Sequence, residues 1–245
     1  MALLHINHLS MSRGTQRNLT VILPSDGMDE KHSGESFMKP GMKYQTLWLL
    51  HGGGGDDSDW VNFSNIVRYA NEHKIAVVMP EGQNFFEDDY AYITEELPAF
   101  LRAILPLSDK REDNFIGGLS HGGDASMKAC FEHPDLYAAG LIMSAAGTDH
   151  KGPVEEAALR FDVFGCAEKL LQPGVEIPKL IFGTGSGDRG FPYYVRVIDK
   201  LDSMGIPLTR YYIENEGHSW DFWDSTVRKA LNEMLPIRHN VILPD

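Results

Sequence analysis

Short apolar runs alternate with segments of helical pattern along most of this chain, and this alternation constrains the fold more than any other feature. The apolar runs predict strands at 45–50, 75–80, 114–119, 138–145, 178–183 and 207–214. Between and after them, helices are predicted at 58–74, 88–105, 122–134, 191–204 and 219–235. Alternation of this kind is typical of an α/β fold, in which helices flank a mostly parallel central sheet.

Two further strands, predicted at 3–10 and 17–24, precede the alternating region, and we expect them to form an antiparallel edge of the sheet. No linker divides the chain, so a single domain is predicted over 1–245. A polar stretch at about 25–44 predicts a variable loop, because long connections without regular pattern are often functional. The segment at about 148–176 is helical or irregular and predicts a small cap-like insertion.

Composition narrows the range of partners. The 245 residues carry a formal net charge of −13, which disfavours phosphate backbones and anionic lipid, so no nucleic-acid or membrane partner is expected. No apolar run approaches the roughly 20 residues that span a bilayer, and the start lacks a signal-peptide pattern, which predicts a cytoplasmic protein. Cys130 and Cys166 predict free thiols, and the histidines lack metal-ligand spacing, so no metal or cofactor is expected.

The motif G-x-S-x-G at 118–122 predicts a catalytic nucleophile. It follows the strand at 114–119 and opens a helical segment, which is the context that a nucleophile elbow requires. Gly118 and Gly122 allow the strand and the helix to approach closely, so that the hydroxyl of Ser120 stands clear of the sheet. A glycine-rich turn with an incidental serine is the simpler alternative.

A serine hydroxyl needs a base, and the base needs an acid. His218 is predicted as the base, because it follows the last strand at the sheet edge where open α/β folds build their sites. His121 adjoins Ser120, but its side chain is expected to turn away. Asp188 is predicted as the acid, because it follows the strand at 178–183 and gives the chain order Ser, Asp, His. Three other acids are less well placed in the predicted fold: Asp162, Glu176 and Asp221.

Donors for a developing oxyanion are predicted where HGGGG ends the strand at 45–50. One donor is the backbone N–H of His121, the residue after the nucleophile. The other is the N–H of Gly53, with Gly54 as the alternative. His51 is expected to order this loop, and the absence of G-x-x-x-x-G-K-[ST] excludes a P-loop.

The stretch GTGSGDRG at 183–190 also matches the letters of the dinucleotide fingerprint G-x-G-x-x-G. That interpretation is disfavoured, because Asp188 would place a carboxylate beside two phosphates. Gly190 also falls before the predicted helix, since Pro192 suits a first helical position. The glycines are better explained as a loop that carries Asp188 towards His218.

With these residues assembled, the chain resembles the esterase D family of α/β-hydrolases, especially its tributyrin esterase and feruloyl esterase branch. The resemblance rests on LLHGGGGDDSDW, GGLSHGGDASMKAC, GTGSGD and GHSWDFW. It implies an α/β-hydrolase fold and a triad at Ser120, Asp188 and His218, with backbone donors at Gly53 and His121. The family often has methionine after the nucleophile where this chain has His121.

These features predict a serine carboxylesterase that acts on a small-molecule ester with a short acyl group or an aryl group. A thioesterase of the S-formylglutathione hydrolase type and a catalytically silent α/β-hydrolase used as a binding module are the alternatives. The sequence does not choose between a monomer and a homo-oligomer, and it does not define the natural acyl and alcohol groups.

Overall fold

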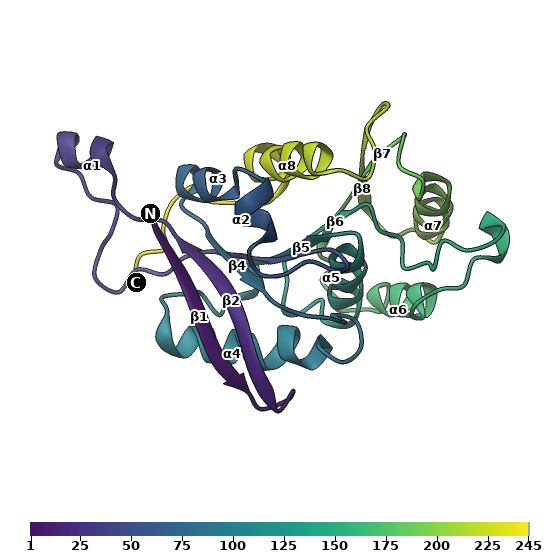
Figure 1. The fold of residues 1–245 in the computed structure, drawn as a ribbon, viewed down its shortest axis with the longest axis horizontal. Coiled ribbons are helices and arrows are strands. Elements are labelled where there is room, and N and C mark those ends of the chain that lie inside the picture. Colours follow the sequence, from purple (N-terminus) through teal and green to yellow (C-terminus); the bar gives the residue numbers. More distant parts are fainter. Residues whose placement is uncertain (245) are drawn as a thin grey trace.

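Eight strands form one sheet in the computed structural model, which describes residues 1–244 (Figure 1). The strand order is β1-β2-β4-β3-β5-β6-β7-β8. The six strands from β3 onward run parallel, whereas the β1–β2 hairpin pairs antiparallel with β4. The bounds are β1 Ala2–Ser10, β2 Thr15–Leu23, β3 Thr46–Leu50, β4 Ala76–Pro80, β5 Asn114–Leu119, β6 Ala139–Met143, β7 Lys179–Gly185 and β8 Leu208–Ile213. The predicted α/β fold with an antiparallel edge is confirmed.

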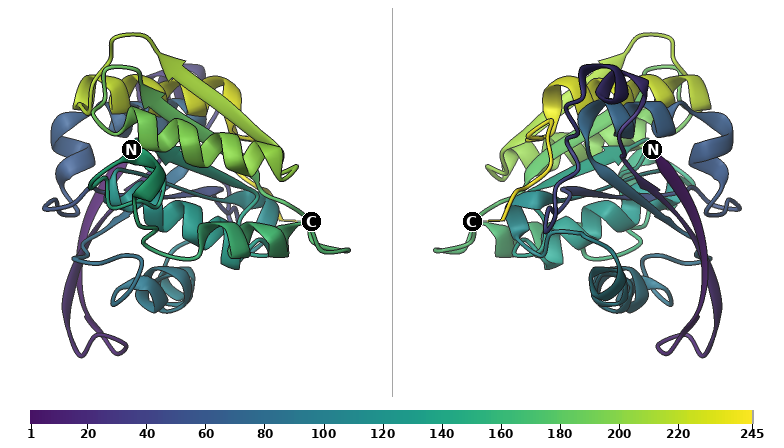
Figure 2. Two further views of the ribbon diagram at one scale, coloured as in Figure 1. Left: turned by 90° about the vertical axis from the view of Figure 1, so that its right-hand side faces the viewer. Right: turned by 90° about the vertical axis from the view of Figure 1, so that its left-hand side faces the viewer.

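Helices cover both faces of the sheet, and each face has its own apolar cluster (Figure 2). Side chains of α2, α3 and α8 pack on one face. Side chains of α4, α5, α6 and α7 pack on the other. The bounds are α1 Met28–Ser33, α2 Asp59–Phe63, α3 Ile66–His73, α4 Leu97–Ile104, α5 His121–Glu132, α6 Val163–Leu170, α7 Phe191–Ser203 and α8 Trp220–Lys229. The inner strands are apolar on both faces because both faces are covered.

Two predicted helices are divided in the structure. The segment predicted at 58–74 is split into α2 and α3, because Ser64 is extended (φ −137°, ψ 176°) and its hydroxyl accepts the N–H of Ile66. The segment predicted at 88–105 begins as a π-helical turn, Tyr92–Glu96, and continues as α4. Pro98 lies in the first turn of α4, where the π-helical turn ends.

The two irregular segments each contain short helices. The loop predicted at about 25–44 includes α1, which is tied to the body by an ion pair between Glu30 and Lys74. The segment at about 148–176 contains α6, whose first turn is capped by the Asp162 carboxylate. Cys130 and Cys166 are buried free thiols. Within residues 1–244, no helix has both the length and the apolar character needed to cross a membrane.

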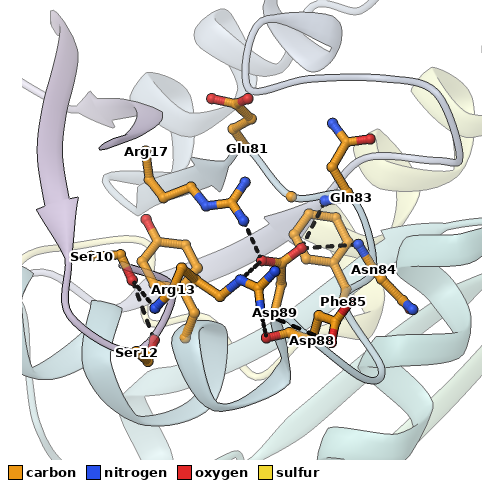
Figure 3. Close-up of polar contacts among 12 residues, drawn as sticks. Ser10, Ser12, Arg13, Arg17, Glu81, Gln83, Asn84, Phe85, Asp88 and Asp89 are labelled. Atoms are coloured by element: carbon orange, nitrogen blue, oxygen red, sulfur yellow. Dashed lines mark hydrogen bonds and ion pairs between the residues drawn. The ribbon is translucent and has the colours of Figure 1, made fainter. Parts of the chain in front are cut away.

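A buried carboxylate joins the β1–β2 hairpin to the loop that follows β4 (Figure 3). Oδ1 of Asp89 accepts from Arg17 at 2.7 Å and lies 2.9 Å from Nε of Arg13. Oδ2 accepts the backbone N–H groups of Gln83 and Asn84 at 2.8 and 2.9 Å. The loop at 81–89 therefore has a fixed shape, because one carboxylate holds both the loop and the hairpin beside it.

Candidate active site

Ser120 occupies a sharp turn between β5 and α5. Its backbone lies at φ 52° and ψ −117°, a conformation that residues with a side chain rarely adopt, and its N–H donates to Met143 at 2.8 Å. A Cβ atom built at Gly118 would lie 2.5 Å from the carbonyl carbon of Gly122, so the turn has no room for a larger residue. The molecule therefore has the strand, turn and helix that a nucleophile elbow requires.

His218 and Asp188 form a hydrogen-bonded pair at the same edge of the sheet. His218 lies between β8 and α8, and its Nδ1–H donates to Oδ2 of Asp188 at 2.7 Å. Oδ1 of Asp188 accepts the backbone N–H of Gly190 at 2.8 Å. Burial acts to raise the pKa of Asp188, but the hydrogen bonds from His218 and Gly190 outweigh it and hold that pKa below its ordinary value. An ionised Asp188 can therefore orient the imidazole, of which 29% is exposed.

Ser144 and Trp223 contact each other beside the His218–Asp188 pair, and the sequence pattern did not identify either residue. The indole N–H of Trp223 donates to Oγ of Ser144 at 3.1 Å, and the ring of Trp223 meets the His218 ring edge-on at 4.9 Å. A hydrogen bond from Ser144 also lowers the pKa of Asp188. Ser144 directly follows β6, so its place at the carboxyl end of a buried strand was the one available signal.

The structure places Ser120 after β5 and the His218–Asp188 pair after β7 and β8, with β6 between them. The N–H of Ser120 bonds to the end of β6, and the N–H of Ser144 bonds to Gly183 in β7 at 2.8 Å. The Ser120 hydroxyl makes no hydrogen bond to any group of residues 1–244, so its contact with His218 stays a prediction. Catalytic hydrogen bonds of this kind often tighten only when substrate is bound.

The predicted oxyanion donors are close together. Gly53 approaches the elbow so closely that a Cβ atom built on it would lie 4.0 Å from Cβ of His121. Outside helices and strands, neither the Gly53 N–H nor the His121 N–H donates to a backbone acceptor in residues 1–244. Gly54 has a φ of +79°. Nδ1 of the buried His51 donates to Gly52 at 2.7 Å, so this imidazole orders the glycine loop.

The His121 side chain turns away from Ser120 and into the loop at 81–89. Its Nε2 accepts the N–H of Phe85 at 3.2 Å, and its ring lies 4.5 Å from that of Phe86. Burial, followed by the charges of Arg160 and His51, lowers the pKa of His121 to about 4. The imidazole is therefore neutral at neutral pH and is held against the loop at 81–89.

The less favoured acids have other roles. Asp162 caps α6, and Glu176 pairs with Arg111 at 2.6 Å near the opposite edge of the sheet. Asp221 lies in the first turn of α8. Glycines of the stretch at 183–190 pack against the backbone of Glu216, which brings the loop of Asp188 against the loop of His218.

A surface cavity of about 620 Å³ lies at the amino ends of β6, β7 and β8 and is lined by Arg111, Lys179 and Arg238 among others. The candidate site is at the carboxyl ends, and parallel sheets bind their ligands there. None of the predicted site residues lines this cavity. Among residues 1–244, no group of three or more metal-ligating side chains is found.

A family model described as putative esterase matches residues 10–148, a span that includes His51, Gly53 and Ser120 but ends before Asp188 and His218. An acetyl esterase from Caldicellulosiruptor saccharolyticus is 28% identical over 266 residues, covering 96% of this chain and 98% of the relative.

Two solved structures from Staphylococcus aureus resemble the whole chain. One is the fluorophosphonate-binding serine hydrolase FphF, with 28% identity, a TM-score of 0.81 and coverage of 96% of this chain and 98% of that one. The other is the S-formylglutathione hydrolase FrmB, with 28% identity, a TM-score of 0.79 and the same coverage.

Proposed function

The chain belongs to the putative esterase family, and we propose that it is a serine carboxylesterase whose nucleophile, base and acid are Ser120, His218 and Asp188. The resemblance to the esterase D group of α/β-hydrolases is confirmed, and the protein is an enzyme that acts on carboxylic ester bonds. The proposed substrates are small esters with a short acyl group, such as acetyl or butyryl, or with an aryl group of the feruloyl type.

In the proposed first step, Oγ of Ser120 attacks the ester carbonyl while Nε2 of His218 takes the hydroxyl proton. Nδ1–H of His218 stays hydrogen-bonded to Asp188, which keeps the correct tautomer and stabilises the imidazolium. The negative charge that develops on the carbonyl oxygen is stabilised by the N–H groups of Gly53 and His121. His218 then protonates the departing alkoxide, and an acyl-enzyme forms.

In the second step, water attacks the acyl-enzyme, and His218 removes a proton from that water. Collapse of the second tetrahedral intermediate releases the carboxylic acid and returns the proton to Ser120. The observation that carries this proposal is the 2.7 Å bond between His218 and a buried Asp188, at the sheet edge where Ser120 is held in a strained turn. An incidental serine would not need that backbone conformation.

The test is Ser120→Ala with a 4-nitrophenyl acetate assay and fluorophosphonate labelling. The variant is expected to lose kcat by roughly 10⁴–10⁶-fold and all labelling, because nucleophile and base act as a unit. Ser203→Ala is the matched control, since Ser203 is exposed at the end of α7 and bonds only to Lys200. Retention of hydrolysis by Ser120→Ala would refute the proposal.

A thioesterase is the second candidate, and the likeness to the S-formylglutathione hydrolase FrmB favours it. The same triad can cleave thioesters, because the acyl-enzyme is the same and only the leaving group differs. Values of kcat/KM for S-formylglutathione and for 4-nitrophenyl acetate separate the two. A preference above about tenfold for the thioester would replace the carboxylesterase proposal.

A further inference from the structure

Arg160 is anchored beside the first turn of α5, immediately below the elbow. Its N–H donates to Gly147 at 2.7 Å, and its Nε donates to the carbonyl of Thr148 at 2.8 Å. The same Nε lies 3.5 Å from Oδ2 of Asp124, a buried residue whose own N–H donates to the carbonyl of Ser120 at 3.0 Å. The Nε side of the guanidinium is therefore held next to Asp124, which itself bonds to Ser120.

The other edge of Arg160 is free. Within residues 1–244 its two terminal amino groups make no hydrogen bond, and 32% of the side chain is exposed. The guanidinium carbon lies 5.7 Å from the centre of the Phe86 ring, and that ring lies 4.5 Å from His121, the neighbour of Ser120. The free amino groups thus lie close to Phe86 and to His121, the residue that follows Ser120.

His150 brings a second donor to the same region. Its backbone has a φ of +52°, and its ring packs between Tyr193 at 5.1 Å and Tyr194 at 5.2 Å. Nε2 is buried and has no hydrogen-bond partner among residues 1–244. Burial and the charge of Arg160 lower the pKa of His150. Tyr194, against which the ring packs, lies against Gly190, whose N–H donates to the proposed acid Asp188.

Asp188, Asp89 and Asp124 already have partners, and none of them hydrogen-bonds to the terminal amino groups of Arg160. Asp188 is bonded to His218, and Asp89 is bonded to two arginines. Asp124 accepts the N–H of Gly147 at 2.6 Å and pairs with Nε of Arg160 at 3.5 Å. In a chain of net charge −13, this cationic edge beside the nucleophile is a local exception.

We propose that Arg160, assisted by His150, forms a subsite for a carboxylate group of the substrate. The planar guanidinium offers two parallel N–H donors, the geometry that carboxylates match best, and Nε2–H of His150 can add a third. The preferred substrates are then esters in which the acyl or the alcohol part carries a second, ionised carboxylate. This inference rests on the carboxylesterase proposal, because it assigns a substrate class to the same site.

Matched substrate pairs test the subsite on either side of the ester bond. On the alcohol side, 4-acetoxybenzoate is compared with 4-acetoxybenzamide. On the acyl side, mono-(4-nitrophenyl) terephthalate is compared with 4-nitrophenyl 4-carbamoylbenzoate. In each pair the para position prevents the carboxylate from attacking its own ester, and the amide is a neutral group of similar shape. The readout is the ratio of kcat/KM values, carboxylate over carboxamide.

The wild-type ratio is expected to exceed 1 by about 10- to 100-fold in one pair, the range for a hydrogen bond between charged groups. Arg160→Gln should bring that ratio close to 1, and Arg160→Lys should retain part of it. Arg68→Gln is the control, because Arg68 is an exposed cation on α3 that pairs only with Glu72. Its ratio should equal that of wild type.

Two outcomes overturn the subsite. A wild-type ratio near or below 1 in both pairs would show that no carboxylate is recognised. A high ratio that Arg160→Gln leaves intact would assign recognition to another cation. Failure of the carboxylesterase proposal gives a different result. The wild-type enzyme would then cleave neither the esters that carry a carboxamide nor 4-nitrophenyl acetate.

Discussion

Replacing Asp89 by Asn should destabilise the fold and weaken catalysis together. The carboxylate is fully buried, accepts hydrogen bonds from Arg17 and from the backbone N–H groups of Gln83 and Asn84, and forms an ion pair with Arg13 at 2.9 Å (Figure 3). An amide of the same shape has one acceptor oxygen in place of two. It also turns an N–H₂ group towards existing donors, and it leaves the nearly buried Arg17 without its counter-charge.

The size of the loss follows from these contacts. Removing one partner of a buried ion pair costs about 3–5 kcal/mol, because the remaining charge is left without compensation. In a chain of this length, each kcal/mol lowers Tm by about 2–4 °C, so Asp89→Asn should lower Tm by about 6–20 °C. Arg17 is nearly buried whereas Arg13 is partly exposed, and water can therefore relieve only the second of the two.

Asp89→Asn should also lower activity, because Asp89 holds the loop at 81–89 and that loop contacts the candidate active site. The N–H of Gly82 donates to Nε2 of His51 at 3.3 Å, and the N–H of Phe85 donates to His121, so this loop helps to hold both sides of the proposed oxyanion hole. We expect kcat/KM at 20 °C, well below Tm, to fall by about tenfold, the effect of losing about 1.4 kcal/mol of transition-state stabilisation.

Circular dichroism melting and ester hydrolysis provide the assay, with Asp88→Asn as the control. Asp88 is the adjacent residue, but its side chain is 68% exposed and stands 3.9 Å from Arg13, so its loss should cost less than about 1 kcal/mol. The reasoning is refuted if both variants melt within 2 °C of each other, because burial of Asp89 would then have no measurable consequence.

Three further predictions concern the site itself. Gly118→Ala should lower kcat at least 100-fold, since its Cβ would meet the backbone of Gly122 at 2.5 Å; normal fluorophosphonate labelling would contradict this. Ser144→Ala should lower kcat by about tenfold with little change in KM, because Asp188 loses a hydrogen bond; an effect on KM alone would contradict a positioning role. Burial lowers the pKa of His121 to about 4, so the folded state binds fewer protons than the unfolded state between pH 6.5 and 4, and stability is lost as pH falls through that window. His121→Met should remove up to about 2 kcal/mol of that loss between pH 7 and pH 5, measured by urea unfolding at those two pH values; identical pH dependence in both proteins would contradict it.

The sequence predicted the parts of the molecule that local pattern determines. Strands buried on both faces are continuous apolar runs, and the tight turn at Ser120 requires glycines at fixed spacing, so both features can be recognised from neighbouring residues. The hydrogen bond between His218 and Asp188 was expected from chain order, because the ends of parallel strands meet at one edge.

The remaining features depend on contacts between distant residues, which leave no periodic signal. Arg17 and Asp89 are 72 positions apart, and Trp223 and Ser144 are 79 apart. Single polar residues in loops look alike in sequence whether they are solvated or buried. The break at Ser64 was missed for a related reason, since the N–H of the next residue is satisfied by Asp224 from α8, far along the chain.

The backbone at Ser120 has a consequence for how such a protein changes over time. A φ of 52° with a ψ of −117° is the mirror image of an ordinary extended conformation, which glycine adopts freely and serine does not. Holding serine there costs of order 1–3 kcal/mol. Glycine at position 120 would therefore give a more stable but inactive protein, so selection for folding and selection for chemistry favour different residues at this position. In a lineage that no longer needed the reaction, position 120 would be among the first to change, and the gain in stability would itself make the loss hard to reverse.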